Sequence, residues 1–228
     1  MEMTIGSWRM TLERIHPTPI ELLQMYDAEA VHWHRTIERL GYLHAYKALF
    51  KRLQTEGILD RLPRHARVLD VGIGTGGLSL SLAQSCSAHL HLHGVDISVE
   101  MLRQSRQALN QIGFDSTLTH CDVRALGFHD ATFDLVMGTH VLEHLPNPLV
   151  ALYEMTRVLR PGAPLLLLVS QPRIWTTFMQ MRWRYVAYAP NRVKKWMDWV
   201  GLSDVQVCAL QGKLPSYTSF AYLGFKIK

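Results

Sequence analysis

The chain is poor in cysteine, in charged residues and in long apolar runs. It contains three cysteines, Cys86, Cys121 and Cys208, and no two of them form a CxxC pair. An odd number without metal-binding spacing argues against a disulfide framework or a cysteine zinc site and favours a reducing compartment. The longest apolar run, Leu165–Val169, is far shorter than the ~20 residues that span a bilayer. Residues 1–10 carry charges and no continuous apolar stretch, so we expect no signal peptide and a cytoplasmic protein.

What is present indicates an ordinary globular chain. Apolar residues make up 48% of the 228 residues and charged residues 19%, which argues against disorder. The length suits one α/β domain with a small additional cap. The net charge of +5 is mildly basic. It would help to attract an anionic substrate or membrane surface, but it is below what a dedicated nucleic-acid binder usually carries.

The order of apolar segments predicts helices first and a βαβ pattern afterwards. Apolar residues at helical spacing indicate a helical segment over residues 19–57, with Gly57 as its stop. From residue 66 onward, short apolar strands alternate with amphipathic helices, which is typical of a parallel sheet. The predicted strands are 66–71, 89–95, 115–120, 133–138, 163–169, 202–210 and 217–226, and the predicted helices are 76–86, 98–110 and 147–159.

A glycine-rich turn follows the first predicted strand. The turn contains Gly72, Gly74, Gly76 and Gly77 and leads directly into a helix. Glycines there permit positive φ and close approach of a ligand to the backbone. The same glycines also satisfy the dinucleotide-binding pattern, so the turn alone does not separate a nicotinamide cofactor from other nucleosides.

Two carboxylates help to separate these cofactors. Asp70 stands two residues before the first glycine, where it gives no benefit to a pyrophosphate but suits a ligand with a sulfonium and an amino group. Asp96 ends the next strand, where a carboxylate can accept hydrogen bonds from ribose hydroxyls. The feature at Asp96 suits either class of cofactor, whereas Asp70 favours a ligand without phosphate.

Five segments follow one another along the middle of the chain: VLDVGIGTGGLSLSLA, GVDISVEML, HCDVRALGF, FDLVMGTHVLEHLPNP and RVLRPGAPLLLLVS. In this order they resemble the motifs of class I S-adenosylmethionine-dependent methyltransferases, a Rossmann-like family, and in particular its broad small-molecule group, which includes quinone-biosynthesis enzymes. The resemblance implies a doubly wound, mostly parallel seven-stranded sheet with helices on both faces and a small N-terminal helical cap. It also implies S-adenosyl-L-methionine as cofactor and methyl transfer to a small molecule, by in-line displacement, as the function.

The resemblance also implies which residues hold the cofactor. Asp70, Gly72, Gly74 and Gly76 would border its methionine part, and Asp96 its ribose. The adenine would lie among Ile97, Met101, Asp122 and Val123, whereas Thr139 and His140 would lie beside the sulfonium. Taken singly, the three aspartates could equally be helix caps or turn residues. Their joint occurrence in order at strand ends favours cofactor binding.

The candidates for catalysis are His140, Glu143 and His144, which follow the fourth motif strand. A base is needed only if the acceptor must lose a proton. The two histidines would share one face if this segment were helical. Some quinone methyltransferases bind a divalent metal here, but His140 stands where an acidic residue is expected, so we predict no metal. His89, His91 and His93 alternate along a strand and are interpreted as a polar face instead of a metal site.

The acceptor pocket is expected from residues outside the motifs. We assign residues 1–60 to the N-terminal cap, residues 61–228 to the methyltransferase domain, and residues 173–200 to an insertion that acts as an acceptor-site lid. Alternatively, this insertion contacts a membrane or packs as an ordinary amphipathic helix, and Trp196, Met197 and Trp199 are expected in the core. Aromatic side chains in the two outer segments indicate an apolar or aromatic acceptor. They are Tyr26, Trp33, Tyr42, Tyr46, Trp175, Phe178, Trp183, Tyr185 and Tyr188.

Other functions fit parts of the pattern. The fold alone does not exclude an oxidoreductase, a catalytically silent cofactor-binding partner or another use of the cofactor, such as aminopropyl transfer. An RNA methyltransferase is a further alternative, although no RNA-binding module is recognisable and DNA is not expected as a partner. We leave open whether the protein is a monomer or a homodimer and whether it touches a membrane peripherally.

Overall fold

The computed structural model describes residues 2–5, 7–11, 18–86, 89–173, 176 and 184–227. The chain begins with a hairpin that the sequence did not predict: β1 (Glu2–Ile5) pairs antiparallel with β2 (Trp8–Thr11) in a sheet of two strands. In the described residues, no helix is long and apolar enough to cross a membrane.

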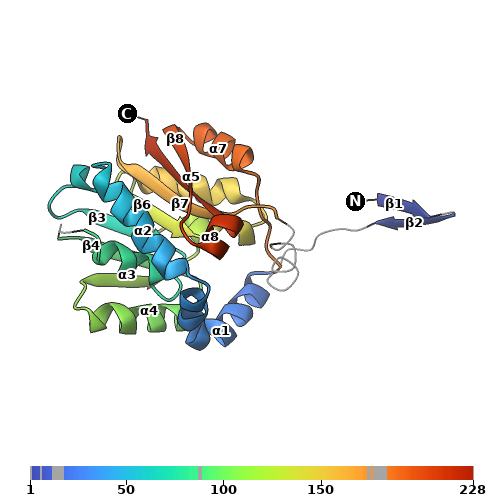
Figure 1. Ribbon diagram of the computed structural model, residues 1–228, viewed down its shortest axis with the longest axis horizontal. Helices are drawn as coiled ribbons and strands as arrows, with labels where there is room; N and C mark the ends of the chain where they lie inside the picture. The colour runs from blue at the N-terminus through green and yellow to red at the C-terminus, as the bar shows by residue number, and fades with distance from the viewer. Residues whose placement is uncertain are drawn as a thin grey trace.

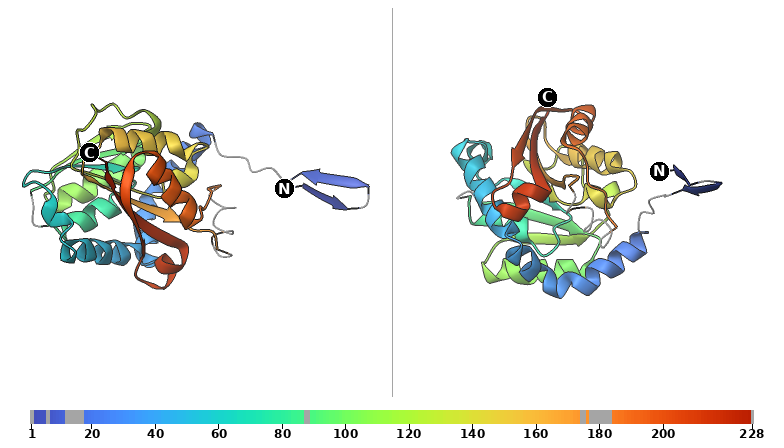
Figure 2. Two further views of the ribbon diagram at one scale, coloured as in Figure 1. Left: turned by 90° about the horizontal axis from the view of Figure 1, so that it is seen from above. Right: turned by 45° about the vertical axis from the view of Figure 1, so that its right-hand side comes forward.

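The main sheet has seven strands in the order β5-β4-β3-β6-β7-β9-β8, with the helices on both of its faces (Figures 1 and 2). The strands from β5 to β7 are parallel, and β9 runs antiparallel to both β7 and β8. The predicted Rossmann-like architecture is thereby confirmed. The strands are β3 (Arg67–Val71), β4 (His91–Asp96), β5 (Ser116–His120), β6 (Leu135–Thr139), β7 (Pro164–Ser170), β8 (Leu202–Ala209) and β9 (Ser219–Lys226).

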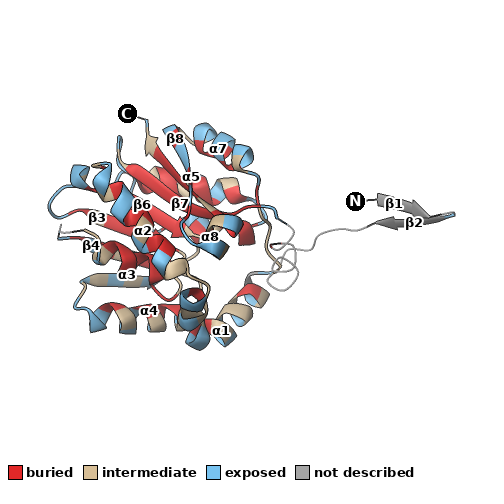
Figure 3. Ribbon diagram, viewed as in Figure 1, coloured by how far each residue is buried: buried red, intermediate tan, exposed pale blue. Residues whose placement is uncertain are grey.

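The sheet separates two apolar clusters, because successive side chains of a strand point to opposite faces. Val68 and Leu166 lie in the cluster under helices α2 to α4, whereas Leu69 and Leu167 lie in the cluster under α5 and α7. The central strands are therefore buried on both sides, as Figure 3 shows in red. The helices of these layers are α2 (Tyr42–Thr55), α3 (Gly77–Ala83), α4 (Val99–Gln111), α5 (Pro148–Val158) and α7 (Pro190–Trp199).

The segment 19–57 is helical as expected and consists of two helices, α1 (Pro19–Arg39) and α2, because Gly41 adopts a φ of +83° that an α-helix cannot contain. Two other expectations about the outer segments were wrong in detail. The last strand starts at Ser219, because α8 (Lys213–Thr218) precedes it. Trp199 is 71% exposed, since the buried face of α7 is set by Val193 and Met197.

Short turns complete the sheet's carboxyl edge. Helix α4 begins at the predicted cap, where the Ser98 hydroxyl accepts a hydrogen bond from the Met101 N–H. Among the described residues, three single-turn 3₁₀ helices connect the larger elements, and two of them follow strands at this edge. They are η1 (Leu59–Arg61), η2 (Val123–Ala125) and η3 (Leu142–His144).

Candidate functional site

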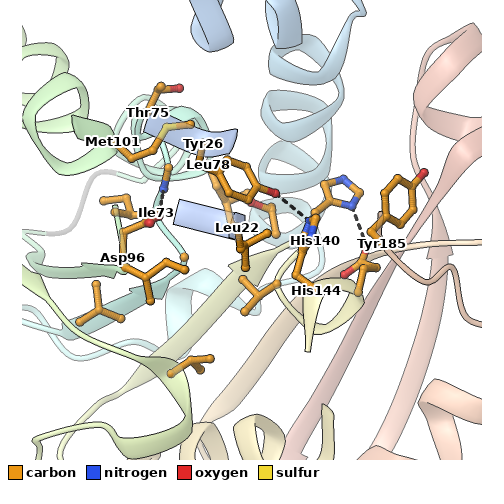
Figure 4. Close-up of a pocket in the computed structure, with 18 of the residues that line it drawn as sticks. Leu22, Tyr26, Ile73, Thr75, Leu78, Asp96, Met101, His140, His144 and Tyr185 are labelled. Atoms are coloured by element: carbon orange, nitrogen blue, oxygen red, sulfur yellow. Dashed lines mark hydrogen bonds and ion pairs between the residues drawn. The ribbon is translucent and has the colours of Figure 1, made fainter. Parts of the chain in front are cut away.

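A cavity opens where β3, β4 and β6 end, at the carboxyl edge of the parallel sheet. Gly72, Asp96 and Thr139 line it from these three strands, and helix α1 contributes Tyr26 and Trp33 from the opposite side. Figure 4 shows Asp96 and Met101 at one end of the cavity and His140 and Tyr185 at the other. Open α/β sheets bind ligands at this edge.

The glycine turn leaves room for a ligand at one position. Gly72 and Gly74 adopt φ values of +64° and +54°. A Cβ on Gly72 would come within 2.5 Å of Val141 Cγ2, whereas a Cβ on Gly74 would meet no atom within 4 Å. The backbone at Gly74 therefore faces free space that a ligand could occupy, and a side chain at this position would fill that space.

Asp96 is fixed beside this turn by the backbone. Its Oδ2 accepts from Gly74 N–H at 2.9 Å, and its Oδ1 accepts from Ser98 N–H at 2.9 Å. Burial raises the pKa of this carboxyl, and the backbone hydrogen bonds partly oppose that effect. Each carboxylate oxygen retains a lone pair for a further donor, so Asp96 can still accept hydrogen bonds from a hydroxylated ligand.

The other side chains expected at the adenine also line the cavity. They are Ile97, Met101, Asp122 and Val123. Asp122 is paired with Arg124, whose Nη2 lies 2.5 Å from its Oδ2, and this guanidinium lowers the pKa of the carboxyl. Asp122 would thus have to share its oxygens between Arg124 and a bound nucleoside.

Two of the expected cofactor residues, Asp70 and Gly76, are not among those that line the cavity. Asp70 is fully buried and accepts a hydrogen bond from Ser79 Oγ at 2.6 Å. Burial raises the pKa of Asp70 to about 7, and the nearby Asp96 adds to the rise. Gly76 has a φ of +82°, and a Cβ there would lie 3.3 Å from Ser105 Cβ, so this glycine allows the turn to pack against α4.

The three candidate catalytic residues meet at the opposite end of the cavity. His140 has a φ of +56°, and the following residues form a single 3₁₀ turn, so the two histidines are not on an α-helix as considered above. Glu143 is buried: its Oε1 accepts from Ser170 N–H at 2.6 Å and lies 2.9 Å from His140 Nδ1. Burial raises the pKa of Glu143, but the hydrogen bond and charge of His140, with the Ser170 N–H, lower it below the ordinary value.

His144 is held by the N-terminal helix. Its Nε2 lies 2.7 Å from the hydroxyl of Tyr26, and Figure 4 marks this contact by a dashed line. Burial lowers the pKa of His144 to about 4, although the Glu143 carboxylate opposes the change. His144 is therefore neutral near pH 7 and can act as a hydrogen-bonding group more readily than as a cation.

The structure adds residues to this end that motif reasoning did not identify. Ser170 Oγ lies 3.1 Å from His140 Nδ1, and Tyr185 and Tyr42 also line the cavity. Ser170 directly follows the predicted strand 163–169. Its position at the carboxyl end of a strand could therefore have identified it as a candidate site residue. Tyr42 and Tyr185 were expected only as members of aromatic segments. Several aromatic residues of the insertion lie outside the described residues: Trp175, Phe178 and Trp183.

No described group of three or more histidine, cysteine or acidic side chains is arranged to hold a metal ion. His91 lies 3.3 Å from Asp115, and His93 packs edge-on against Phe133. His89 stacks on His65 with a centroid distance of 5.8 Å. His65 therefore lies beside both His89 and His91, whereas the ring neighbours of His93 are Phe128 and Phe133.

Comparison with known proteins supports the motif assignment. Residues 69–167, less than half of the chain, match the family described as methyltransferase domain. The chain is 37% identical over 101 residues to a phosphatidylethanolamine N-methyltransferase of Cereibacter sphaeroides, covering 43% of this chain and 48% of the relative. It is 32% identical over 139 residues to a demethylmenaquinone methyltransferase of Bacillus cytotoxicus, covering 60% of this chain and 56% of the relative. The chain thus spans about half the length of these curated relatives.

The fold is also found in a solved methyltransferase. Magnesium protoporphyrin IX methyltransferase from Synechocystis PCC 6803, solved with bound SAH, superposes with a TM-score of 0.73 at 18% identity, covering 91% of this chain and 99% of that protein. At this identity the likeness concerns the fold alone. Together these findings confirm that the chain resembles class I S-adenosylmethionine-dependent methyltransferases.

Proposed function

We propose that the protein binds S-adenosyl-L-methionine and transfers its methyl group to a small-molecule acceptor. The observation that carries the proposal is a single cavity. At one end it is lined by Gly74, which has free space in front of its backbone, and by Asp96, and at the other end by His140, Glu143, His144 and Tyr185. The relatives named above, methyltransferases of a phospholipid and of a quinone, support a small acceptor.

The cofactor would occupy the end of the cavity near Asp96. The Asp96 carboxylate would accept hydrogen bonds from the ribose, and Ile97, Met101 and Val123 would contact the adenine together with Asp122. Gly72 and Gly74 would border the methionine part. Thr139 and His140 would lie toward the sulfonium. When bound, the cofactor supplies an already activated methyl group, so much of the remaining work is positioning the acceptor and excluding water.

The outer segments would close the acceptor side. We propose residues 1–60 as the cap, residues 61–228 as the methyltransferase domain, and residues 173–200 as a lid. This division is supported by the contacts of α1 with the cavity and by the ion pair of Arg184 Nη1 with Glu21 Oε1, at 3.1 Å, which links lid and cap. A cytoplasmic location, the oligomeric state and any membrane contact stay predictions.

Calorimetric titration with S-adenosylmethionine, S-adenosylhomocysteine and NAD tests the proposal directly. We expect micromolar binding of the first two ligands and none of NAD. Mass spectrometry of acceptor mixtures incubated with cofactor should then reveal a product heavier by one methylene. Binding of NAD alone would contradict the proposal. Cofactor binding without any methylated product, from RNA or from small molecules, would favour the silent-partner alternative.

A further inference from the structure

The acceptor end of the cavity contains a buried carboxylate that is only half satisfied. Oε1 of Glu143 has its two neighbours, Ser170 N–H and His140, but Oε2 is buried and has no hydrogen-bond partner. Glu143 has no surface exposed to solvent, and it is one of the residues that line the cavity. Leaving a buried acceptor unsatisfied costs free energy, so we expect this oxygen to accept a hydrogen bond from a donor group of the ligand.

Aromatic rings border the two histidines that stand next to this carboxylate in the cavity. Tyr26 packs edge-on against His144 with a centroid distance of 5.4 Å, and Tyr185 lies 5.9 Å from the same ring. Tyr42 packs edge-on against His140 at 5.7 Å. Figure 4 shows Tyr26 and Tyr185 on the two sides of the histidines. Tyrosine faces attract cations, most strongly where water is excluded.

The described lining of the cavity offers almost no positive charge to balance these groups. Arg124 is its only arginine or lysine, and Arg124 is already paired with Asp122 at the cofactor end. His144 is neutral. The charge of His140 is already directed at Oε1 of Glu143. An anionic acceptor such as a carboxylate or phenolate would therefore face Glu143 without an unpaired cation beside it, whereas a cation would find both the carboxylate and the rings.

We propose that the acceptor is an amine, recognised in its ammonium form by Glu143 within a cage of Tyr26, Tyr42 and Tyr185. This inference rests on the proposed function and names the substrate class of the same site. The N–H donors of the ammonium satisfy Oε2 of Glu143. The aromatic faces contribute to binding its charge and its attached carbon atoms.

The transfer step is balanced without a further reactant. The bound ammonium first releases one proton to solvent. The lone pair of the resulting amine forms a bond to the methyl carbon as the carbon–sulfur bond breaks, and that bonding pair stays on sulfur. Positive charge thereby moves from sulfur to nitrogen, toward Glu143. A carboxylate fixed at this position stabilises the charge that develops in the transition state.

Ligands that share a phenethyl group and differ in its polar end test the inference. Protein saturated with S-adenosylhomocysteine is titrated calorimetrically at pH 7.5 with phenethylamine, 2-phenylethanol and 3-phenylpropionate. We expect the amine to bind at least about tenfold more tightly than the alcohol, and the carboxylate to bind least. If the amine shows no preference over the alcohol, whether both bind or neither binds, the inference is overturned. Prior titration with S-adenosylhomocysteine keeps this result separate from a failure of the proposed function.

Variants identify the groups responsible. Glu143→Gln should lower the affinity for phenethylamine by about tenfold and leave that for 2-phenylethanol within about twofold, whereas general damage would lower both. Tyr185→Leu should weaken amine binding selectively, and Tyr185→Phe should restore it because the aromatic face is kept. The Tyr185 pair is decisive if Glu143→Gln does not fold. An equal loss of amine affinity in Tyr185→Leu and Tyr185→Phe, or none in either, would contradict the cage.

Discussion

The two ends of the cavity are built in different ways. At the cofactor end, Gly74 and Asp96 follow neighbouring strands and are joined by a backbone hydrogen bond of 2.9 Å. At the acceptor end, Tyr26 meets His144 across 118 positions of sequence, and Tyr42 meets Thr218 across 176. The first end is specified by short motifs and sheet geometry. The second exists only when distant segments have packed together.

The pKa values of the carboxyl groups are also shifted in opposite directions at the two ends. Burial raises the pKa values of Asp70 and Asp96, near the cofactor end. Glu143 is equally buried, but His140 and the Ser170 N–H hold its pKa below the ordinary value. The pKa values of buried carboxyl groups are thus raised at the cofactor end and lowered at the acceptor end, where the charge of His140 stabilises the anion of Glu143.

The largest expected effect concerns Asp70 and pH. Its pKa is raised from 3.8 to about 7 in the folded protein. The folded state therefore holds this proton more tightly than the unfolded state, and stability falls as pH rises from about 4 to 7, by up to about 4 kcal/mol. Asp70→Asn cannot ionise, so its free energy of unfolding relative to the original protein should increase over this window. Urea unfolding at half-unit pH intervals measures the difference.

When the original protein and Asp70→Asn are compared, the contributions of the other titrating groups to stability cancel. His144 acts in the opposite direction, because burial lowers its pKa to about 4 and stability is lost as pH falls from 6.5 through that value. That contribution is present in both proteins and cancels in the difference. Parallel stability curves for the two proteins would show that Asp70 ionises in the folded state as easily as in the unfolded chain.

The second prediction tests whether the cofactor end depends on a bare backbone. Gly74→Val places a branched side chain in open space at a φ of +54°. We expect the affinity for S-adenosylhomocysteine to fall by about a hundredfold or more, equivalent to about 2.7 kcal/mol. Gly113→Val is the matched control, because Gly113 has a φ of +64° and equally free surroundings but does not line the cavity. Equal losses in both variants would attribute the effect to backbone strain.

The third prediction concerns the charge at the same end. Asp96→Ala removes the carboxylate that accepts from Gly74 and Ser98. We expect the affinity for S-adenosylhomocysteine to decrease by about 10- to 150-fold, since hydrogen bonds to an ionised acceptor contribute roughly 1.5–3 kcal/mol. Circular dichroism serves as the folding check. Unchanged affinity in a folded variant would remove Asp96 from the ribose site.

The contrast between the ends also explains what the sequence could predict. The strand positions, the cap at Ser98 and the glycine turn follow from local patterns of apolar residues and glycines, and the structure has the strands within two residues of their expected bounds. The placement of Ser170 beside His140 depends on the pairing of β6 with β7, and the contact of Tyr26 with His144 depends on how α1 crosses the cavity. No local periodicity encodes such long-range packing.

The errors at the outer segments have a similar cause. The expected helical segment 19–57 did not specify the break at Gly41, because apolar residues at helical spacing occur on both sides of it. Trp199 was expected in the core from its residue type, although its position two residues after the buried Met197 turns it away. Composition indicates whether a segment is buried, but the direction of a single side chain is decided by the helix's final orientation on the sheet.

The smallest expected effect tests the independence of the two ends. Tyr26→Phe keeps the ring but removes the hydroxyl that lies 2.7 Å from His144 Nε2. Both ring nitrogens of His144 would then lack a protein partner, since Nδ1 already has none. We expect a loss of about 1 kcal/mol in the free energy of unfolding and a change of less than about twofold in affinity for S-adenosylhomocysteine. Tyr42→Phe is a control of the same chemistry at the same end, whose hydroxyl contacts Thr218 instead. A large loss of cofactor affinity in Tyr26→Phe alone would show that the cap helps to form the cofactor end, and that the two ends are assembled as one unit.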